Sequence, residues 1–172
     1  MNTPSEVAVS DDFAATLVRW QRLYGRHELP WQTGDAYGVW VSEIMLQQTQ
    51  VQTVIGYYRR IIERFPTLAA LAAADEATVM ENWSGLGYYA RARNLHRAAR
   101  EVMTRFGGRF PTTVEDIESL PGIGRSTASA IATFCFGAHG PILDGNVKRV
   151  FARVFGIDGF PGTRAVEQRM WA

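Results

Sequence analysis

Apolar residues recur at steps of three and four along almost the whole chain, and this periodicity restricts the fold more than any other sequence feature. In residues 51–65 the stripe consists of Val51, Val54, Ile55, Tyr58, Ile61, Ile62 and Phe65. Such spacing predicts an amphipathic helix with a broad buried face, ended by Pro66. No segment alternates apolar and polar residues as a half-buried strand would. We therefore predict an all-α protein.

The same spacing predicts helices in seven further segments, and glycines punctuate the joints between several of them. These segments are residues 12–24, 37–46, 76–83, 89–106, 114–119, 126–136 and 146–155. Another helix begins near Thr163 and reaches the end of the sequence without a cap, which predicts truncation. A chain of 172 residues with 47% apolar residues suits one globular domain of two lobes.

The sequence shows no sign of a membrane span or of export. No apolar run approaches the roughly 18–20 residues of a membrane span, and residues 1–13 lack the pattern of a secretory signal. The single cysteine, Cys135, allows no internal disulfide. We expect a monomer in the cytoplasm, with no membrane contact, associated with the nucleoid if the source is bacterial.

The charge is unevenly distributed although the net charge is only +1. Residues 1–84 carry six arginines against ten acids, and residues 85–172 carry twelve basic residues against seven acids. The basic excess falls in the half that contains most of the glycine-rich joints. This pattern is compatible both with polyanion binding and with ordinary solvated helix faces.

A short hairpin, Leu-Pro-Gly-Ile-Gly at residues 120–124, separates two predicted helices. Gly122 and Gly124 permit positive φ and leave the backbone uncovered, and the first amides of the next helix have no intrahelical partner. Such a turn can present N–H groups to a phosphate, aided by the helix dipole. It can equally be a tight helix–helix connection. Asp144, some twenty residues downstream at the start of another helix, favours the first interpretation.

Hairpin, helix and aspartate in this order and spacing resemble the helix-hairpin-helix DNA glycosylase superfamily. The resemblance implies the helix-hairpin-helix glycosylase fold, with residues 30–140 as a six-helix lobe that contains the hairpin. Residues 1–29 and 141–172 would form an incomplete second lobe. Over residues 1–172 the chain would thus be one glycosylase domain, truncated at its C-terminus.

Breaking the bond between a base and its sugar requires protonation of the departing base and stabilisation of the sugar cation, which two carboxyl groups can divide between them. Asp144, at a helix N-terminus, is the candidate stabiliser, although it could merely cap that helix. Glu43 stands in an apolar stretch, where it is either a solvated side chain or part of a site. The string SEIMLQQTQV around it resembles the adenine-glycosylase (MutY-type) branch, in which this glutamate protonates adenine at N7.

The resemblance continues through LPWQ at residues 29–32 and GLGYYARARNLH at residues 85–96. It implies roles in DNA binding, in the base pocket and in support of catalysis. The DNA-binding residues would be Gln48, Tyr88, Gly122, Gly124 and Arg91; the base pocket would include Trp31, Leu46 and Val51; and Asn146 and Ser126 would support catalysis. Trp31 and Leu46 could alternatively belong to the plain core, and Arg91 and its neighbour Arg93 suit phosphate contact.

Ser126 occupies the position at which the lyase branch carries a lysine. Because a hydroxyl group cannot form an imine, we predict base removal without strand cleavage. The expected substrate is double-stranded DNA with adenine opposite 8-oxoguanine or guanine. Two alternatives remain: an endonuclease-III-like glycosylase/lyase of oxidised pyrimidines, which Glu43 and Ser126 oppose, and a non-catalytic helix-hairpin-helix DNA-binding module.

The sequence departs from the family in its missing C-terminal features. Members usually carry four cysteines that hold a 4Fe–4S cluster, and a Nudix-like domain that helps recognise 8-oxoguanine. Neither is present here, so we expect no metal or cofactor bound by this chain. Cys135, on a helix, is predicted to be a small core residue. The terminal helices are expected to expose apolar surface, because the helices that would cover them are missing.

Overall fold

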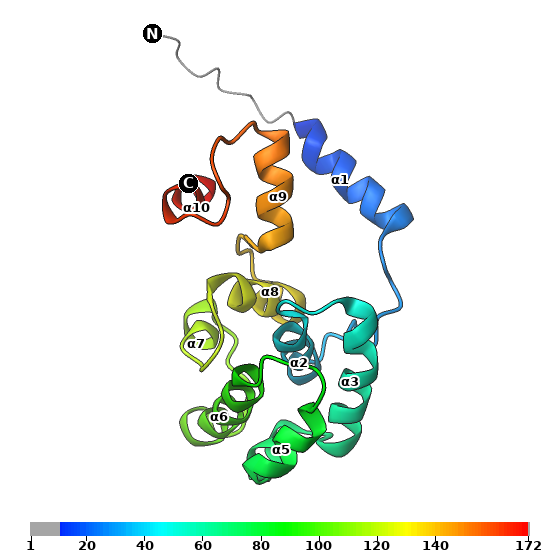
Figure 1. The fold of residues 1–172 in the computed structure, drawn as a ribbon, viewed down its shortest axis with the longest axis vertical. Helices are drawn as coiled ribbons and strands as arrows, with labels where there is room; N and C mark the ends of the chain where they lie inside the picture. The colour runs from blue at the N-terminus through cyan, green and yellow to red at the C-terminus, as the bar shows by residue number, and fades with distance from the viewer. Residues whose placement is uncertain (1–10, 172) are drawn as a thin grey trace. The chain divides into compact units, whose positions relative to one another are not determined.

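A computed structural model describes residues 11–171 of the chain. Over that range the chain forms ten helices and no strand, which confirms the all-α prediction (Figure 1). The helices are α1 (Asp11–Tyr24), α2 (Ala36–Leu46), α3 (Val51–Arg64), α4 (Leu68–Ala73), α5 (Glu76–Trp83), α6 (Ala90–Arg105), α7 (Val114–Glu118), α8 (Arg125–Phe136), α9 (Gly145–Val154) and α10 (Arg164–Trp171).

The chain divides into two compact units. Residues 28–142 contain α2 to α8, and the two terminal segments contain α1, α9 and α10. Six of the seven helices between residues 28 and 142 lie where the periodicity predicts them. The additional one, α4, consists of six apolar residues, LAALAA, so no polar face marks a helical period. It begins because the Thr67 hydroxyl accepts the Ala70 amide at 3.1 Å.

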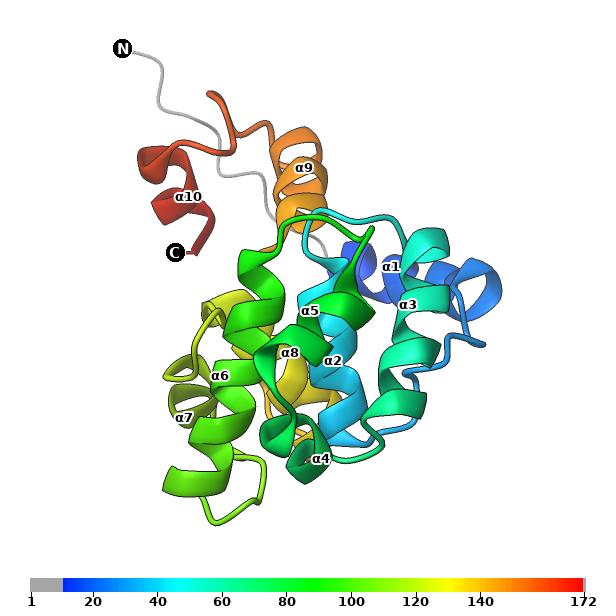
Figure 2. The same cartoon turned by 60° about the horizontal axis from the view of Figure 1, so that its bottom comes forward.

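Helix α2 forms the centre of the larger unit. It packs against α3, α6 and α8, and Figure 2 shows it between α3 and α8. Asp35 starts the helix by accepting the Gly38 amide at 2.8 Å. From residue 37 to residue 45 every side chain except Glu43 is buried, and Trp40 and Met45 are fully buried. A helix that is apolar on all sides belongs in a core, so Glu43 is an exception that requires explanation.

The smaller unit has a much thinner core. Phe13 of α1 meets Phe155 edge-on at 5.7 Å between ring centroids, and Lys148 of α9 pairs with Glu167 of α10 at 2.9 Å. At the C-terminal end of α1, Leu23 and Tyr24 are 69% and 70% exposed. The expected exposure of apolar surface on the N-terminal helix is therefore present.

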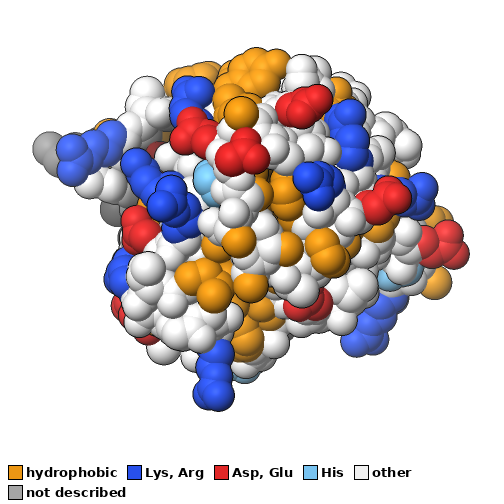
Figure 3. All heavy atoms as spheres, turned by 90° about the horizontal axis from the view of Figure 1, so that it is seen from below, with side chains coloured by type: hydrophobic (Ala, Val, Ile, Leu, Met, Phe, Trp, Pro, Cys, Tyr) orange, Lys and Arg blue, Asp and Glu red, His pale blue; other side chains and the backbone are white. Residues whose placement is uncertain are grey.

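The surface is mixed in charge on the face seen from below Figure 1, where acidic, basic and apolar side chains are interspersed (Figure 3). Among the helices of residues 11–171, none combines the length and apolar character that a membrane crossing requires.

Candidate active site

Glu43 opens into a cavity of about 410 Å³ within the larger unit. The other lining residues are Leu29, Trp31, Gln32, Gly34, Val39 and Phe134. The volume lies within the roughly 300–1,000 Å³ of small-molecule sites. The lining is mainly apolar, so Glu43 contributes a carboxyl group to an otherwise weakly polar wall. The exceptional acid of α2 therefore faces a space that a flat apolar group can enter.

The structure places the three predicted base-pocket residues differently. Trp31 is 7% exposed; it lines this cavity and packs its ring edge-on against Tyr58 at 5.3 Å. Trp31 is therefore both a core residue and part of the cavity wall. Leu46 and Val51 are half-buried against the core at the end of α2 and the start of α3, outside the lining of this cavity.

Cys135 follows the cavity residue Phe134 on α8 and packs half-buried against the core. Burial, with contributions from the Asp35 and Glu43 carboxylates, raises the pKa of the Cys135 thiol to about 11. A 4Fe–4S cluster needs several thiolate ligands, and this chain has one cysteine. Within residues 11–171 no group of three or more His, Cys, Asp or Glu could hold a metal ion. These residues do not fit a cluster.

The raised pKa gives a direct test of the surroundings of Glu43. We expect the labelling rate of Cys135 to rise with pH around a midpoint near 11. At pH 8 its thiolate fraction would be roughly 200-fold below that of free cysteine. Glu43→Gln should lower the midpoint, because it removes a negative charge that opposes the thiolate. Iodoacetamide labelling followed by mass spectrometry measures this, with the urea-unfolded chain as control; a midpoint near 8.5 in the folded chain would contradict it.

Asp144 lies in the smaller unit and caps α9. Its Oδ1 accepts the amides of Asn146 and Val147, both at 2.8 Å, and Asn146 Nδ2 lies 3.5 Å from its Oδ2. Asn146 in turn accepts a hydrogen bond from Arg149. The carboxylate is exposed. Capping and catalysis are compatible here, because the amides engage mainly one oxygen of the carboxylate.

Gln48 and Tyr88 line a second pocket, of about 330 Å³, on the larger unit. Gln48 lies in the turn between α2 and α3, and Tyr88 precedes α6. Both have left-handed backbones, with φ of 58° and 48°, and among the described residues they are the only non-glycine residues with positive φ. Such conformations cost about 1–3 kcal/mol each and persist only where neighbouring structure enforces them. The two residues expected to probe the duplex are thus the two strained ones.

Arg91 does not lie as a phosphate-binding residue would. It is 8% exposed, and its guanidinium donates to protein oxygens, among them the Met45 carbonyl at 2.7 Å and the Gly87 carbonyl at 3.3 Å. A guanidinium whose donors point into the protein has few left for DNA. We therefore revise the expected direct phosphate contact. The exposed neighbour Arg93 also lines the Gln48–Tyr88 pocket and is the better candidate.

The two hairpin glycines differ in backbone conformation and in the space around them. Gly122 has φ of 78°, and a Cβ there would lie 2.7 Å from the Cβ of Asn94. Gly124 has φ of −101°, open space around its Cα, and the N-cap position of α8 without a side-chain cap. Gly124 therefore does not use the positive φ that a glycine permits, whereas Gly122 does. What Gly124 provides is an uncovered helix start, and Ser126 lies half-buried in that first turn.

We expect Gly122→Ala to destabilise the chain by about 1–3 kcal/mol, because it adds left-handed strain and a clash with the α6 side chain. Gly124→Ala, at a position with free space and an extended backbone, should leave stability nearly unchanged. Thermal unfolding followed by circular dichroism measures both. Equal melting temperatures for the two variants would contradict this account of the hairpin.

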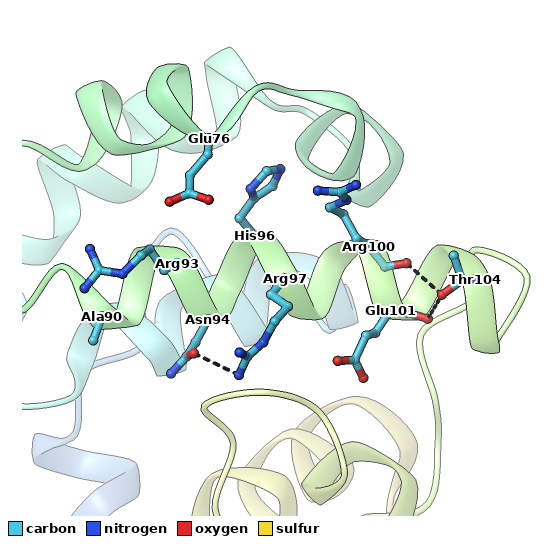
Figure 4. A pocket seen from close by; sticks show the side chains of 9 residues that line it. All are labelled: Glu76, Ala90, Arg93, Asn94, His96, Arg97, Arg100, Glu101 and Thr104. Carbon is cyan, nitrogen blue, oxygen red and sulfur yellow. Dashed lines mark hydrogen bonds between the residues drawn. The ribbon is translucent and has the colours of Figure 1, made fainter.

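Arg93 also belongs to a groove of about 460 Å³ along α6. Figure 4 shows Arg93, Arg97 and Arg100 spaced along this helix, with Glu76 of α5 pointing towards it. Glu101 also lines the groove and pairs with Arg105 at 3.0 Å. Since the acids offset part of the arginine charge, the basic excess of the C-terminal half is not a single strongly positive patch here.

Sequence reasoning missed several residues that shape these sites. Phe134 is 60% exposed beside Glu43, just beyond the buried middle of its helix at residues 128–132. Tyr57 closes over Gly85, where a Cβ would lie 2.3 Å from its hydroxyl oxygen. Asn94 packs against Gly122 in the same way. The periodicity could place each residue on a helix, but it carried no signal for these contacts between distant segments.

Residues 41–172 match the family described as HhH-GPD superfamily base excision DNA repair protein. The chain therefore belongs to this superfamily, which confirms the resemblance seen in its motifs. The chain is also similar to curated adenine DNA glycosylases. It is 45% identical to that of Buchnera aphidicola subsp. Baizongia pistaciae over 160 residues, which cover 92% of this chain and 45% of the relative. It is 44% identical to that of Homo sapiens over 176 residues, which cover 96% of this chain and 32% of the relative.

The chain thus spans less than half the length of these two relatives. Among solved structures, a thermostable thymine-DNA glycosylase matches with a TM-score of 0.82 and 26% identity, over 92% of this chain and 73% of that one. A non-covalent complex of endonuclease III with DNA matches with a TM-score of 0.74 at 20% identity, over the same shares of the two chains. The latter likeness concerns the fold.

Proposed function

We propose that this chain removes adenine from double-stranded DNA by hydrolysis, acting as a monomeric, monofunctional glycosylase on adenine opposite 8-oxoguanine or guanine. The observation that carries the proposal is Glu43: on a helix buried on all other sides, this acid opens into an aromatic-walled cavity. The similarity to curated adenine DNA glycosylases supports the choice of base.

In this proposal Glu43 is the general acid. Adenine leaves readily only when its ring nitrogen is protonated, so that it departs as a neutral molecule. Trp31 and Phe134 would contact the flat faces of the extruded base, while the Glu43 carboxyl group delivers the proton. General acid catalysis of this kind contributes roughly 10²–10⁴-fold.

Asp144 would stabilise the sugar as positive charge develops on it. The exposed carboxylate is held by two amides at the start of α9, so its direction is set before the substrate arrives. Fixed charge of this kind needs no reorganisation in the transition state. Asn146, beside the second carboxylate oxygen, would steady it. Water then adds to the sugar and leaves an abasic site.

Strand cleavage is not expected. The lyase reaction needs an unprotonated amine to form a Schiff base with the sugar, and Ser126 offers a hydroxyl group. The only lysine, Lys148, is already engaged by Glu167, whose carboxylate oxygen lies 2.9 Å from its Nζ. The abasic product should therefore stay intact until it is heated in alkali.

The DNA-facing surface would combine probing residues with phosphate contacts. Gln48 and Tyr88 would enter the space left by the extruded base, which costs a few kcal/mol of unstacking. Gly122 and Gly124 would bring the hairpin backbone and the uncapped start of α8 close to a phosphate. Arg93, exposed beside the probing residues, would add a further phosphate contact. Leu46 and Val51 would support the turn that carries Gln48.

The test is single-turnover release of adenine from a duplex containing adenine opposite 8-oxoguanine, with protein in excess and chromatographic detection of the free base. Release that leaves a strand cleaved only after alkali supports the proposal. Strand cleavage without alkali, or a complex trapped by borohydride, would indicate a lyase instead. Tight duplex binding by a folded chain that releases no base would indicate a binding module.

A further inference from the structure

The guanidinium of Arg91 joins two segments of the larger unit that lie about forty residues apart in the sequence, residues 44–49 and residues 86–87. Towards the end of α2 it donates to the carbonyls of Ile44, Met45 and Gln47 and to the Thr49 hydroxyl. Towards the loop before α6 it donates to the Gly87 carbonyl at 3.3 Å and lies 3.5 Å from the Leu86 carbonyl.

Each of the two strained residues stands directly beside these acceptors. Gln48 lies between Gln47 and Thr49, and Tyr88 follows Gly87. The guanidinium carbon also lies 5.4 Å from the centre of the Tyr88 ring, so the same group touches the side chain that would enter DNA. The buried Arg91 guanidinium therefore contacts residues directly adjacent to both left-handed residues, Gln48 and Tyr88.

The contacts of this site call for an arginine. The last carbonyls of α2 have no amide partner within the helix and carry the negative end of its dipole, so they attract a cation. The two terminal nitrogens of the guanidinium divide these acceptors: Nη1 donates to the end of α2, and Nη2 donates to Thr49 and to the loop before α6. A lysine ammonium has three donors on a single atom, too few and too closely spaced for acceptors spread over both segments. The Arg91 Nε is buried without a hydrogen-bond partner. The hydrogen bonds of the other two guanidinium nitrogens offset the cost of burying it.

We propose that Arg91 is a positioning residue that holds Gln48 and Tyr88 together in their left-handed conformations, so that both enter the duplex as adenine leaves it. The inference rests on the proposed function, and it assigns Arg91 to base extrusion rather than to bond cleavage. Without Arg91 each turn can relax on its own to a right-handed backbone, and the two probes lose their common alignment. Misplacement of about 1 Å can cost roughly 100-fold in rate.

The test separates extrusion from cleavage with two substrates. In the first, adenine pairs with 8-oxoguanine in a duplex; in the second, adenine lies opposite a stable abasic analogue, where extrusion is easier. We expect Arg91→Gln and Arg91→Lys to slow single-turnover release from the first substrate by about 10- to 100-fold and from the second by far less. Arg100→Gln, which removes an exposed charge from the same helix, should match the parent on both.

A second measurement would follow extrusion directly, with 2-aminopurine placed beside the target adenine and the chain carrying Glu43→Gln. The fluorescence rise on binding should be lost when Arg91→Gln is added. Ethylguanidinium, supplied to Arg91→Ala, should restore part of it by filling the vacated site. Should the Arg91 variants unfold, Thr49→Val removes one acceptor and should give a smaller loss, confined to the substrate in which adenine pairs with 8-oxoguanine.

Three results would overturn the inference: parental rates in the Arg91 variants, equal losses on both substrates, or an unchanged 2-aminopurine signal. Equal losses would indicate a general effect on stability or chemistry, and a thermal melt distinguishes these two. If the parent raises the 2-aminopurine signal but releases no adenine, the proposed function fails while the role of Arg91 is still measurable. If the parent releases adenine and the variants match it, only the inference fails.

Discussion

Glu43→Gln should reduce adenine release by about 10²–10⁴-fold, the contribution of a positioned general acid, while duplex binding is retained. Glutamine has nearly the same shape as glutamate, so the cavity wall formed with Trp31 and Phe134 keeps its form. It has no acidic proton to give, so adenine would have to leave as an anion. Single-turnover release and a fluorescence binding titration on the same duplex measure the two effects separately.

The control for this variant is Glu63→Gln, which removes an exposed acid from α3 and should release adenine at the parental rate. A Glu43→Gln chain that still releases adenine within about threefold of the parent, less than one positioned acid contributes, would show that the base is protonated by another group. Loss of binding together with release would indicate that Glu43 holds the pocket together instead.

Asp144→Asn should reduce release by about 10²–10³-fold, the typical effect of removing one preorganised electrostatic group, without unfolding α9. Asparagine and aspartate are equally good N-caps, so the contacts to the Asn146 and Val147 amides can persist. What asparagine lacks is the negative charge that opposes the developing sugar cation. Chromatographic base release and thermal unfolding measure the two properties.

The matched variant Asp144→Ala separates the two roles of this residue. Alanine removes both the charge and the cap, so we expect the same loss of release plus about 1 kcal/mol of destabilisation. If Asp144 only caps the helix, the asparagine variant will be as active as the parent and only the alanine variant will be impaired. That outcome would leave the sugar cation without its proposed stabiliser.

The helices followed from sequence because their periodicity depends on local geometry. Residues 37–46 and 76–83 are apolar or amphipathic over whole turns, and the structure has α2 and α5 there within one residue. The helix cap at Asp144 was likewise predictable, since an aspartate before a helical stripe can accept hydrogen bonds from the amides two and three residues ahead. Helix α4 was not predicted, because its six residues are all apolar and no polar face marks a helical period.

The superfamily was also predictable from sequence, through the order and spacing of the hairpin, the helix after it and Asp144. Only the tertiary structure decided what Arg91 contacts: it lies on the buried stripe of α6 with Ala92 and Leu95, but that stripe does not show which groups its guanidinium meets. Its partners lie 42 to 47 residues away at the end of α2, beyond the reach of any local pattern. The same holds for Phe134 beside Glu43 and for the left-handed backbones of Gln48 and Tyr88. Local spacing sets which residues are helical, whereas contacts between distant segments set which charges are buried and which turns are strained.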